Sequence, residues 1–354
     1  MSLRRLEFVV PGDLEGRTGG YGYDRRVIAG LRDLGWQVSI HGLDGSFPHP
    51  SAGALEHARE TFAHLPDQAL VVVDGLALGA MPDVVLPHAE RLRLLALIHH
   101  PLAAESGLGS GQVLELERSE RLALQAMRHV LVTSRATARA LLAYGVGAGQ
   151  VSVVEPGTDA APLAPRHRGT HLNMLCVATL TPRKGHDLLF EALAPLPPNW
   201  RLICAGSLTR SPATVAALRQ QLQRLRLDRQ VVLAGEVDGA GLAQLYAQTN
   251  LFVLPTRLEG YGMAVAEALA RGLPVISTRV GAIPELVGDQ AGLLVAVEDV
   301  DMLRAALARV LSEPDLLDGL ARGAQAVRGS LPRWPDSCAL LSNILQNASD
   351  DRGR

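Results

Sequence analysis

The sequence has almost no lysine. Of its 34 basic side chains, Lys184 is the lone lysine, and all the others are arginines. The formal net charge is −2, which argues against a general binder of polyanions such as nucleic acid. Residues 1–160 hold 14 arginines against 18 acidic residues, a balance that also argues against docking on anionic lipid. The position of Lys184 is therefore a feature to explain.

Cysteine is scarce as well, and the spacings of metal and redox motifs are missing. Cys176, Cys204 and Cys338 are scattered, with no C-x-x-C pair. Two of them fall in expected buried strands, which indicates reduced core thiols in a cytoplasm. No apolar run approaches the ~20 residues that span a bilayer, and the first residues lack a signal-peptide pattern. We therefore expect a cytoplasmic protein without a transmembrane segment.

The dinucleotide-binding pattern G-x-G-x-x-G is absent from the first strand–helix connection. This connection, Thr18-Gly-Gly-Tyr-Gly22, is expected to be a loop before a helix over 24–34. Its sequence makes an NAD-dependent oxidoreductase a poor alternative. Gly19 and Gly20 would still let the loop bend and bring N–H groups near a phosphate, although a glycine pair alone is weak evidence.

Strand and helix patterns alternate along most of the 354 residues. This order predicts an α/β fold with two Rossmann-like, doubly wound parallel sheets. We expect a first domain over 1–160 that is completed by a helix within 332–348, and a second domain over 168–330. After Asn347 we expect disorder. Strands are expected at 6–10, 36–41, 70–74, 93–98, 129–133 and 151–155, then at 173–179, 201–205, 231–235, 251–254, 274–277 and 292–296.

The stretch from Glu259 to Glu267 reads Glu-Gly-Tyr-Gly-Met-Ala-Val-Ala-Glu. It follows an expected buried strand, and an Ala-rich helix continues to Ala270. Gly260 and Gly262 leave backbone N–H groups open to a ligand at the start of that helix, where anions are well held. The two carboxylates could serve one ligand. A capped turn with a surface Glu is the alternative.

Arg183 and Lys184 follow another expected strand, within Thr181-Pro-Arg-Lys-Gly185. Two cations at a strand end suit a diphosphate, because they stabilise the charge that grows on it as it leaves. A solvated Arg-Lys turn is the alternative. Because this is the only lysine in the chain, the first interpretation is favoured.

Two adjacent histidines, His99 and His100, end the expected strand 93–98. Neighbouring residues on a strand point to opposite faces, so we expect only one of them in a ligand cleft, with His99 slightly favoured. A buried, hydrogen-bonded histidine is the competing interpretation. A metal site is not expected, because no third ligand has a suitable spacing. Asp299 and Asp301 resemble a D-x-D motif, but they precede a helical pattern and predict an N-cap.

The Glu259–Glu267 stretch and the Arg183-Lys184 pair together resemble the E-x7-E signature region of retaining glycosyltransferases. The resemblance is to family 4 of the GT-B fold, the group that includes bacterial relatives of glycogen and sucrose synthases. It implies two Rossmann-like domains that face each other across a cleft. It covers nearly the whole chain and is specific in the second domain. Glu155-Pro-Gly-Thr-Asp159 departs from the more usual Asn-Gly-Val-Asp entry to the linker.

The resemblance also implies the roles of site residues. Arg183 and Lys184 would contact the diphosphate of a UDP- or GDP-sugar, in place of a metal ion. Glu259 would bind hydroxyls of the sugar, and Glu267 the ribose. His99 or His100 would line the cleft near the reaction centre. Further donor contacts would come from backbone or loops at Gly19, Gly20, Gly206, Glu236, Val237, Gly260, Tyr261, Gly262 and Met263.

The implied activity is transfer of a sugar with retention at the anomeric carbon, by front-face attack and without a cofactor or metal. The acceptor is not identified by the sequence; a small molecule or a glycan is favoured. Two alternatives stay open. A GT-B-fold sugar-nucleotide epimerase would turn over the donor without any acceptor, and a non-catalytic protein would bind the sugar nucleotide and transfer nothing.

Overall fold

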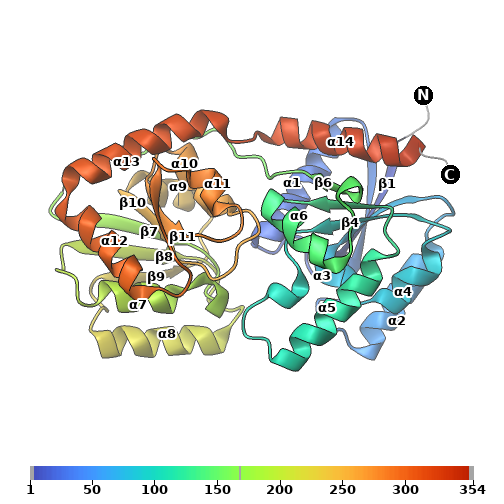
Figure 1. Ribbon diagram of the computed structural model, residues 1–354, viewed down its shortest axis with the longest axis horizontal. Coiled ribbons are helices and arrows are strands. Elements are labelled where there is room, and N and C mark those ends of the chain that lie inside the picture. The colour runs from blue at the N-terminus through green and yellow to red at the C-terminus, as the bar shows by residue number, and fades with distance from the viewer. Residues whose placement is uncertain (1–3, 167–168, 351–354) are drawn as a thin grey trace. The chain divides into compact units, whose positions relative to one another are not determined.

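The computed structural model describes residues 4–166 and 169–350. The chain divides into two compact units, which are described separately below (Figure 1). Unit 1 comprises Met1–Gly157 and Pro332–Arg354, and unit 2 comprises Thr158–Leu331. No helix among the described residues is both long and apolar enough to cross a membrane.

Unit 1 is built on a parallel sheet of six described strands in the order β2-β1-β3-β4-β5-β6. The chain runs outward from β1 to β2 and then returns to β3 on the other side of β1, so the strand order reverses between β1 and β3. Ligands of doubly wound sheets bind beyond the carboxyl ends of the strands at such a reversal. The strands are β1 (Arg5–Pro11), β2 (Gln37–Leu43), β3 (Leu70–Asp74), β4 (Arg93–Ile98), β5 (His129–Val132) and β6 (Val151–Val153).

The helices of unit 1 connect these strands, and the C-terminal helix α14 joins them from the far end of the sequence. Trp36 donates a hydrogen bond from Nε1 to Ser342 Oγ at 2.9 Å, which ties α14 to the turn after α1. The helices are α1 (Gly19–Asp33), α2 (Ala52–His64), α3 (Gly75–Leu78), α4 (Pro82–Val85), α5 (Ser110–Leu124), α6 (Arg135–Leu141) and α14 (Trp334–Asp350), with 3₁₀ turns η1 (Leu86–His88), η2 (Leu102–Ala104), η3 (Leu142–Tyr144) and η4 (Ala148–Gln150).

Two expectations for unit 1 are wrong. The stretch Thr18–Gly22 is not a loop, because α1 already begins at Gly19; the Thr18 hydroxyl accepts from the Tyr21 N–H and caps the helix. The chain is also not disordered directly after Asn347, since α14 continues to Asp350. Leu341 and Leu345 on its buried face hold this helix against the unit and extend its order beyond the expected end.

Unit 2 repeats the architecture with a sheet of six described strands in the order β12-β11-β10-β7-β8-β9. Here the order reverses between β7 and β10, which lie side by side. Figure 1 shows α7 and α8 on one side of this sheet and α10 and α13 on the other. The strands are β7 (Leu172–Val177), β8 (Trp200–Ala205), β9 (Val231–Gly235), β10 (Leu251–Leu254), β11 (Val275–Thr278) and β12 (Gly292–Val295).

Unit 2 helices alternate with these strands. Asp299 caps α12, with its side chain accepting from the Met302 N–H, which confirms the expected N-cap. The helices are α7 (His186–Leu193), α8 (Pro212–Leu225), α9 (Gly239–Ala247), α10 (Met263–Ala270), α11 (Ile283–Val287), α12 (Val300–Ser312) and α13 (Pro314–Val327), with 3₁₀ turns η5 (Pro182–Lys184) and η6 (Arg328–Ser330).

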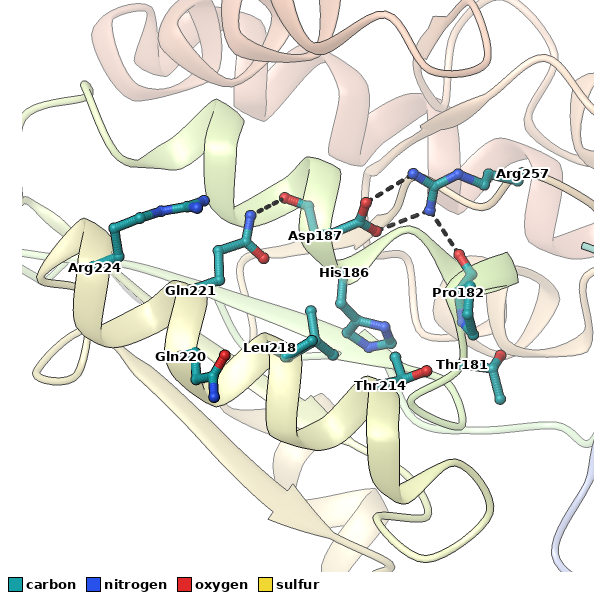
Figure 2. Close-up of a pocket in the computed structure, with 11 residues that line it drawn as sticks. Thr181, Pro182, His186, Asp187, Thr214, Leu218, Gln220, Gln221, Arg224 and Arg257 are labelled. Carbon is teal, nitrogen blue, oxygen red and sulfur yellow. Dashed lines mark hydrogen bonds and ion pairs between the residues drawn. The ribbon is translucent and has the colours of Figure 1, made fainter. Parts of the chain in front are cut away.

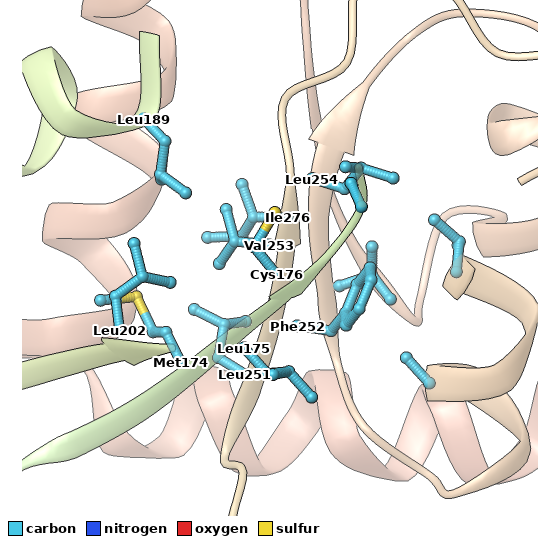
Figure 3. Close-up of a cluster of buried hydrophobic side chains, with 14 of the residues drawn as sticks. Met174, Leu175, Cys176, Leu189, Leu202, Leu251, Phe252, Val253, Leu254 and Ile276 are labelled. Carbon is cyan, nitrogen blue, oxygen red and sulfur yellow. The ribbon is translucent and has the colours of Figure 1, made fainter. Parts of the chain in front are cut away.

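The two central strands of unit 2 are apolar on both faces because helices cover both sides of the sheet. Figure 3 shows side chains of β7 and β10 in this core, among them Met174, Cys176 and Phe252. Each is 2% exposed or less. Full burial of such a side chain contributes ~1.5–3 kcal/mol, so this core fixes the strand ends at which the candidate site residues lie. All three cysteines are buried and free.

Candidate functional site

The turn that carries Arg183 and Lys184 lies against the segment after β10. Gly185 ends this turn with φ of +70°, and a Cβ there would lie 2.0 Å from the Pro255 carbonyl oxygen. Only glycine fits this approach. The Arg257 N–H donates to the Arg183 carbonyl at 2.7 Å, and the Thr256 hydroxyl donates to the same oxygen at 3.1 Å. The ends of β7 and β10 are thus joined through their backbones.

Lys184 and Glu259 form an ion pair at this junction. Lys184 Nζ lies 2.5 Å from Glu259 Oε2, and the two side chains are 13% and 14% exposed. Arg183 donates from Nη1 to the Leu258 carbonyl at 3.0 Å, one residue before Glu259. Burial lowers the pKa of Lys184 and Arg183 acts in the same direction, whereas Glu259 opposes them. Three of the predicted site residues are therefore brought together.

Arg257 stabilises this junction. The sequence analysis did not predict a role for this residue. Its guanidinium makes two hydrogen bonds to Asp187, at 2.8 and 2.7 Å, and one to the Pro182 carbonyl at 2.6 Å (Figure 2). A further bond joins Nε to Glu298 at 2.8 Å. In the sequence, only its position three residues after β10 could have indicated a role at the site. Because a bidentate Arg–carboxylate contact is geometrically specific, Arg257 fixes the turn that presents Arg183 and Lys184.

A cavity of about 700 Å³ lies beside this turn (Figure 2). Residues of α7 and α8 line it, together with Thr181, Pro182 and Arg257. None of the predicted site residues is among those that line it. The cavity therefore adjoins the back of the η5 turn, and the ion pair of Lys184 lies outside it.

The segment from Glu259 to Met263 leads directly into α10. Gly262 is the N-cap with φ of +102°, and Met263 is the first helical residue. The first N–H groups of a helix have no partner within the helix, and its dipole favours negative charge at this end. Tyr261 is 5% exposed, so its side chain packs inward. Gly260 and Gly262 are buried as well, so ligand contact with their backbone stays a prediction.

Glu267 lies in the second turn of α10 and is held by two residues that the sequence analysis missed. The Tyr246 hydroxyl donates to Glu267 Oε2 at 3.1 Å, and the Arg271 guanidinium lies 4.2 Å from the centre of the Tyr246 ring. Burial raises the pKa of Glu267, while Tyr246 and Arg271 oppose that shift. This carboxylate is therefore oriented, and it is largely shielded from water.

The remaining predicted residues of unit 2 lie at neighbouring strand ends. Gly206 follows β8 with φ of +155°, and a Cβ there would lie 2.0 Å from the Ala178 carbonyl oxygen, next to the end of β7. Glycine is required there for packing. Glu236 and Val237 follow β9, at the edge of the sheet, and the Glu236 side chain is exposed.

In unit 1, Gly19 and Gly20 form the first turn of α1. A Cβ at Gly20 would lie 3.5 Å from the His99 ring, so the helix start approaches this histidine closely. His99 and His100 point to different partners. His99 Nε2 lies 3.4 Å from Asp24 and 3.6 Å from Asp74, whereas His100 Nε2 lies 3.5 Å from Glu105.

Asp24 and Asp74 surround His99, and the sequence analysis missed both. Asp24 is 0% and Asp74 3% exposed. The two carboxylates outweigh burial, which would lower the pKa of His99, and raise it to about 10. Burial raises the pKa of Asp24 to about 6. Asp74 ends an apolar strand, a position that could have identified it; Asp24 lies inside a helix and gave no signal.

Among the described residues, Asp24, Asp74 and His99 also form a group of three whose polar atoms lie within 4.8 Å of one another. The charges of this group are already balanced in part, since an imidazolium between two carboxylates attracts both. A charge cluster centred on His99 accounts for the geometry without any further group. The expectation that no metal is bound stays a prediction.

Comparison with known proteins identifies the type of domain in unit 2. Residues 164–327 match the family model "Glycosyl transferases group 1", so unit 2 carries a domain of this group. The chain is 34% identical over 156 residues to the lipopolysaccharide core biosynthesis mannosyltransferase LpsB of Rhizobium meliloti, which is 42% of this chain and 44% of that protein. It is 27% identical over 319 residues to the MMP alpha-(1->4)-mannosyltransferase of Mycolicibacterium hassiacum, 85% of this chain and 76% of that protein. The first of these matches spans less than half of the relative's length.

Solved structures extend the likeness to the whole fold. Sucrose-phosphate synthase from Thermosynechococcus elongatus matches with a TM-score of 0.83 at 21% identity, over 97% of this chain and 98% of that one. Anabaena HepE in complex with UDP-glucose matches with a TM-score of 0.77 at 19% identity, over 97% and 99%. These matches confirm the predicted α/β class with two parallel sheets of the GT-B fold.

Proposed function

We propose that the chain is a retaining glycosyltransferase that moves a sugar from a UDP- or GDP-sugar to a hydroxyl of a small molecule or glycan. One observation carries this proposal. Arg183, Lys184 and Glu259 meet where the strand order of unit 2 reverses, inside a glycosyl transferases group 1 domain. That is the place in a doubly wound sheet where a nucleotide ligand binds.

The donor diphosphate is assigned to Arg183 and Lys184. An ammonium has three donors, so Lys184 can keep Glu259 and still donate to phosphate oxygens. The turn is fixed by backbone contacts, Arg183 is held by the Leu258 carbonyl and Lys184 by Glu259, so the two cations need little reorganisation when charge develops on the leaving group. They would stabilise the negative charge of the diphosphate, as a divalent ion otherwise would. We therefore propose that transfer is metal-independent. Activity should persist in EDTA, and a metal-reversible loss would contradict this.

The sugar and the ribose are assigned to the two carboxylates. Glu259 lies beside the cations and would accept hydrogen bonds from hydroxyls of the transferred sugar. Tyr246 donates to Oε2 of Glu267, which leaves Oε1 as the oxygen that would accept from the ribose hydroxyls. Backbone N–H groups at the start of α10 would contact sugar and phosphate, and the backbone at Gly206, Glu236 and Val237 would contact the nucleotide.

The proposed reaction is a front-face substitution. The acceptor oxygen forms a bond to the anomeric carbon on the face from which the diphosphate departs. The bond between that carbon and the diphosphate oxygen breaks, and the leaving diphosphate takes the acceptor's proton. The products are the glycosylated acceptor and a nucleoside diphosphate. The residues of the chain bind, orient and stabilise charge, and no side chain forms a covalent intermediate.

The test is a binding screen of UDP-, GDP- and ADP-sugars, followed by mass spectrometry of cell extract incubated with the preferred donor. The names of the two mannosyltransferases and of the UDP-glucose complex suggest starting with mannose and glucose donors. We expect a product one hexose heavier, with retained anomeric configuration. Donor turnover without acceptor would indicate an epimerase. Binding without turnover in extracts of several sources would indicate a non-catalytic protein.

A further inference from the structure

His99 lies between two buried carboxylates in unit 1. Asp24 comes from α1 and Asp74 from the end of β3, while His99 directly follows β4. His99 Nε2 is 3.4 Å from Asp24 Oδ1 and 3.6 Å from Asp74 Oδ2. Within the described residues, the buried Asp24 oxygens and His99 Nε2 have no hydrogen-bond partner, so this ion-pair contact is what joins them. Asp74 has a second task, because its Oδ1 accepts from the Leu76 N–H at 2.7 Å and caps α3.

Stability alone does not explain this cluster. A buried charge costs several kcal/mol in lost hydration, and well-packed apolar side chains in place of buried ion pairs often give a more stable protein. Two carboxylates around a single imidazole also repel each other. A buried charged cluster that apolar side chains could replace, at the place where α/β sheets bind their ligands, favours a functional role.

The imidazole is fixed in orientation as well as in charge. The Tyr23 ring meets it edge to face, with centroids 5.5 Å apart and an interplanar angle of 85°. The Thr137 hydroxyl donates to the His99 carbonyl at 3.1 Å and holds its backbone. The His99 side chain is 21% exposed, yet its Nε2 is buried. The exposed part of the ring therefore lies away from the carboxylates.

We propose that Asp24 and Asp74 are positioning residues that fix His99 so that its Nδ1–H donates a hydrogen bond to a sugar hydroxyl of the substrate. This inference rests on the proposed glycosyl transfer. The protonation state decides the direction of that bond. In the imidazolium both ring nitrogens donate, whereas a neutral ring that donates from Nε2 to a carboxylate can only accept at Nδ1.

The groups that face the ring support the charged form. The titratable ones are Tyr23 and Asp24 on α1 and Asp74 at the end of β3, whereas Thr133 and Thr137 after β5 offer neutral hydroxyls. Burial raises the pKa of Tyr23, which therefore stays neutral at pH 7. With the pKa of His99 raised to about 10, the imidazolium persists through neutral pH.

The experiment titrates the full chain by NMR of the histidine ring nitrogens, with His99→Gln used to assign the His99 signals. We expect wild-type His99 to stay doubly protonated from pH 6 to 8.5. Asp24→Asn and Asp74→Asn should each lower its titration midpoint by one pH unit or more, and Asn at position 74 keeps the oxygen that caps α3. Asp33→Asn, exposed on the same helix as Asp24, should leave the midpoint unchanged.

Transfer assays of the same variants give the functional readout. In Asp24→Asn and Asp74→Asn, kcat at pH 8.5 should fall in proportion to the charged fraction of His99, about ten-fold where the midpoint drops to about 7.5, because above the midpoint each further pH unit lowers that fraction about ten-fold. The loss should recover as the pH is lowered to 6, with unchanged donor KM. A purely structural role would lower kcat equally at both pH values.

Three results would overturn the proposal: a wild-type His99 that is neutral at pH 7, midpoints unmoved in both folded variants, or His99 signals that shift on addition of Zn²⁺ or Mn²⁺. The wild-type titration needs no variant, so misfolding of both would not prevent the decision. If wild type transfers no sugar but the titrations come out as expected, the proposed function fails while the coupling of the three side chains stands.

Discussion

The Lys184–Glu259 pair of unit 2 and the Asp24–His99–Asp74 cluster of unit 1 occupy the same place in two similar sheets. Each lies beyond carboxyl ends of strands where the strand order reverses. Their charged groups differ. Unit 2 offers the cations Arg183 and Lys184, with Glu259 beside Lys184, whereas unit 1 offers the imidazole of His99 with two carboxylates beside it.

This difference separates two kinds of ligand contact. On the proposed function, the two cations of unit 2 would attract a diphosphate, while the carboxylates of the unit 1 cluster would repel one and would suit a neutral, hydroxyl-bearing group. The proposal therefore assigns charge stabilisation to unit 2 and orientation of a neutral group to unit 1. The four predictions below test that division, from the largest expected effect to the smallest.

Lys184→Ala should have the largest effect. Removal of one preorganised electrostatic contact to a developing charge typically lowers kcat on the order of 10²–10³-fold. The fold should survive, because the Lys184 side chain extends from the η5 turn to Glu259 and is not part of the hydrophobic core. Steady-state kinetics on protein with a normal circular-dichroism spectrum checks this, with Arg309→Ala, exposed on α12, as the control. Near-normal kcat would remove the diphosphate role.

Glu267→Gln should weaken binding of every nucleotide tested, including the free nucleoside diphosphate. A carboxylate accepts from two ribose hydroxyls better than an amide does, and the loss should be on the order of 1–3 kcal/mol. Isothermal titration calorimetry measures it. Tyr246→Phe removes only the hydroxyl that orients Oε2 and should give a smaller loss in the same direction. Unchanged dissociation constants in Glu267→Gln would exclude the ribose contact.

His99→Ala and His100→Ala should separate in their effects. If His99 contacts the substrate in the transition state, its removal lowers kcat. Nucleotide affinity, which we assign to unit 2, then stays constant. His100 contacts Glu105 and should act mainly on the melting temperature. Kinetics and thermal unfolding of both variants decide this. Swapped effects would assign the substrate contact to His100, and full kcat in both would exclude either histidine from the chemistry.

The pH dependence of stability should show a smaller effect. The folded-state pKa of His99 is raised to about 10 from about 6.5, so its stabilising contribution is complete below pH 6.5 and is lost as the pH rises through 10. Between pH 7 and 9 the free energy of unfolding should fall in both proteins. The fall should be larger in wild type than in Asp24→Asn, by on the order of 1 kcal/mol. Urea unfolding at several pH values measures the difference. Parallel curves would show that Asp24 does not raise the pKa of His99.

The sequence allowed the sheets and the unit 2 cluster to be predicted because both leave local signals. Apolar runs identify parallel strands, and the Arg183-Lys184 turn and the Glu259–Glu267 stretch directly follow two of them. Asp24 left no such signal. It lies in a helix, 50 residues from Asp74, and only the pairing of β1 with β3 and β4 with β3 brings the cluster together.

Residues that hold the site were harder to predict than residues that form it. Arg257 fixes the η5 turn through Asp187, which lies 70 residues away in the sequence. Tyr246 orients Glu267 from another helix. Neither contact follows a periodicity or a motif, because both depend on the packing of two elements. At Thr18–Gly22 we expected a loop, because glycines favour loops over helices. The Thr18 side chain caps α1 and allows the helix to begin with Gly19 and Gly20.

The single lysine has a practical consequence for chemistry on this protein. Besides the α-amino group, the sequence holds one primary amine, and its Nζ is engaged with Glu259 in a side chain that is 13% exposed. An acylating reagent would therefore modify a single internal position, and the rate of modification would report how often that ammonium leaves its partner and loses its proton. A bound diphosphate should slow the labelling, so the mass of one tryptic peptide becomes a direct measure of occupancy for any candidate donor.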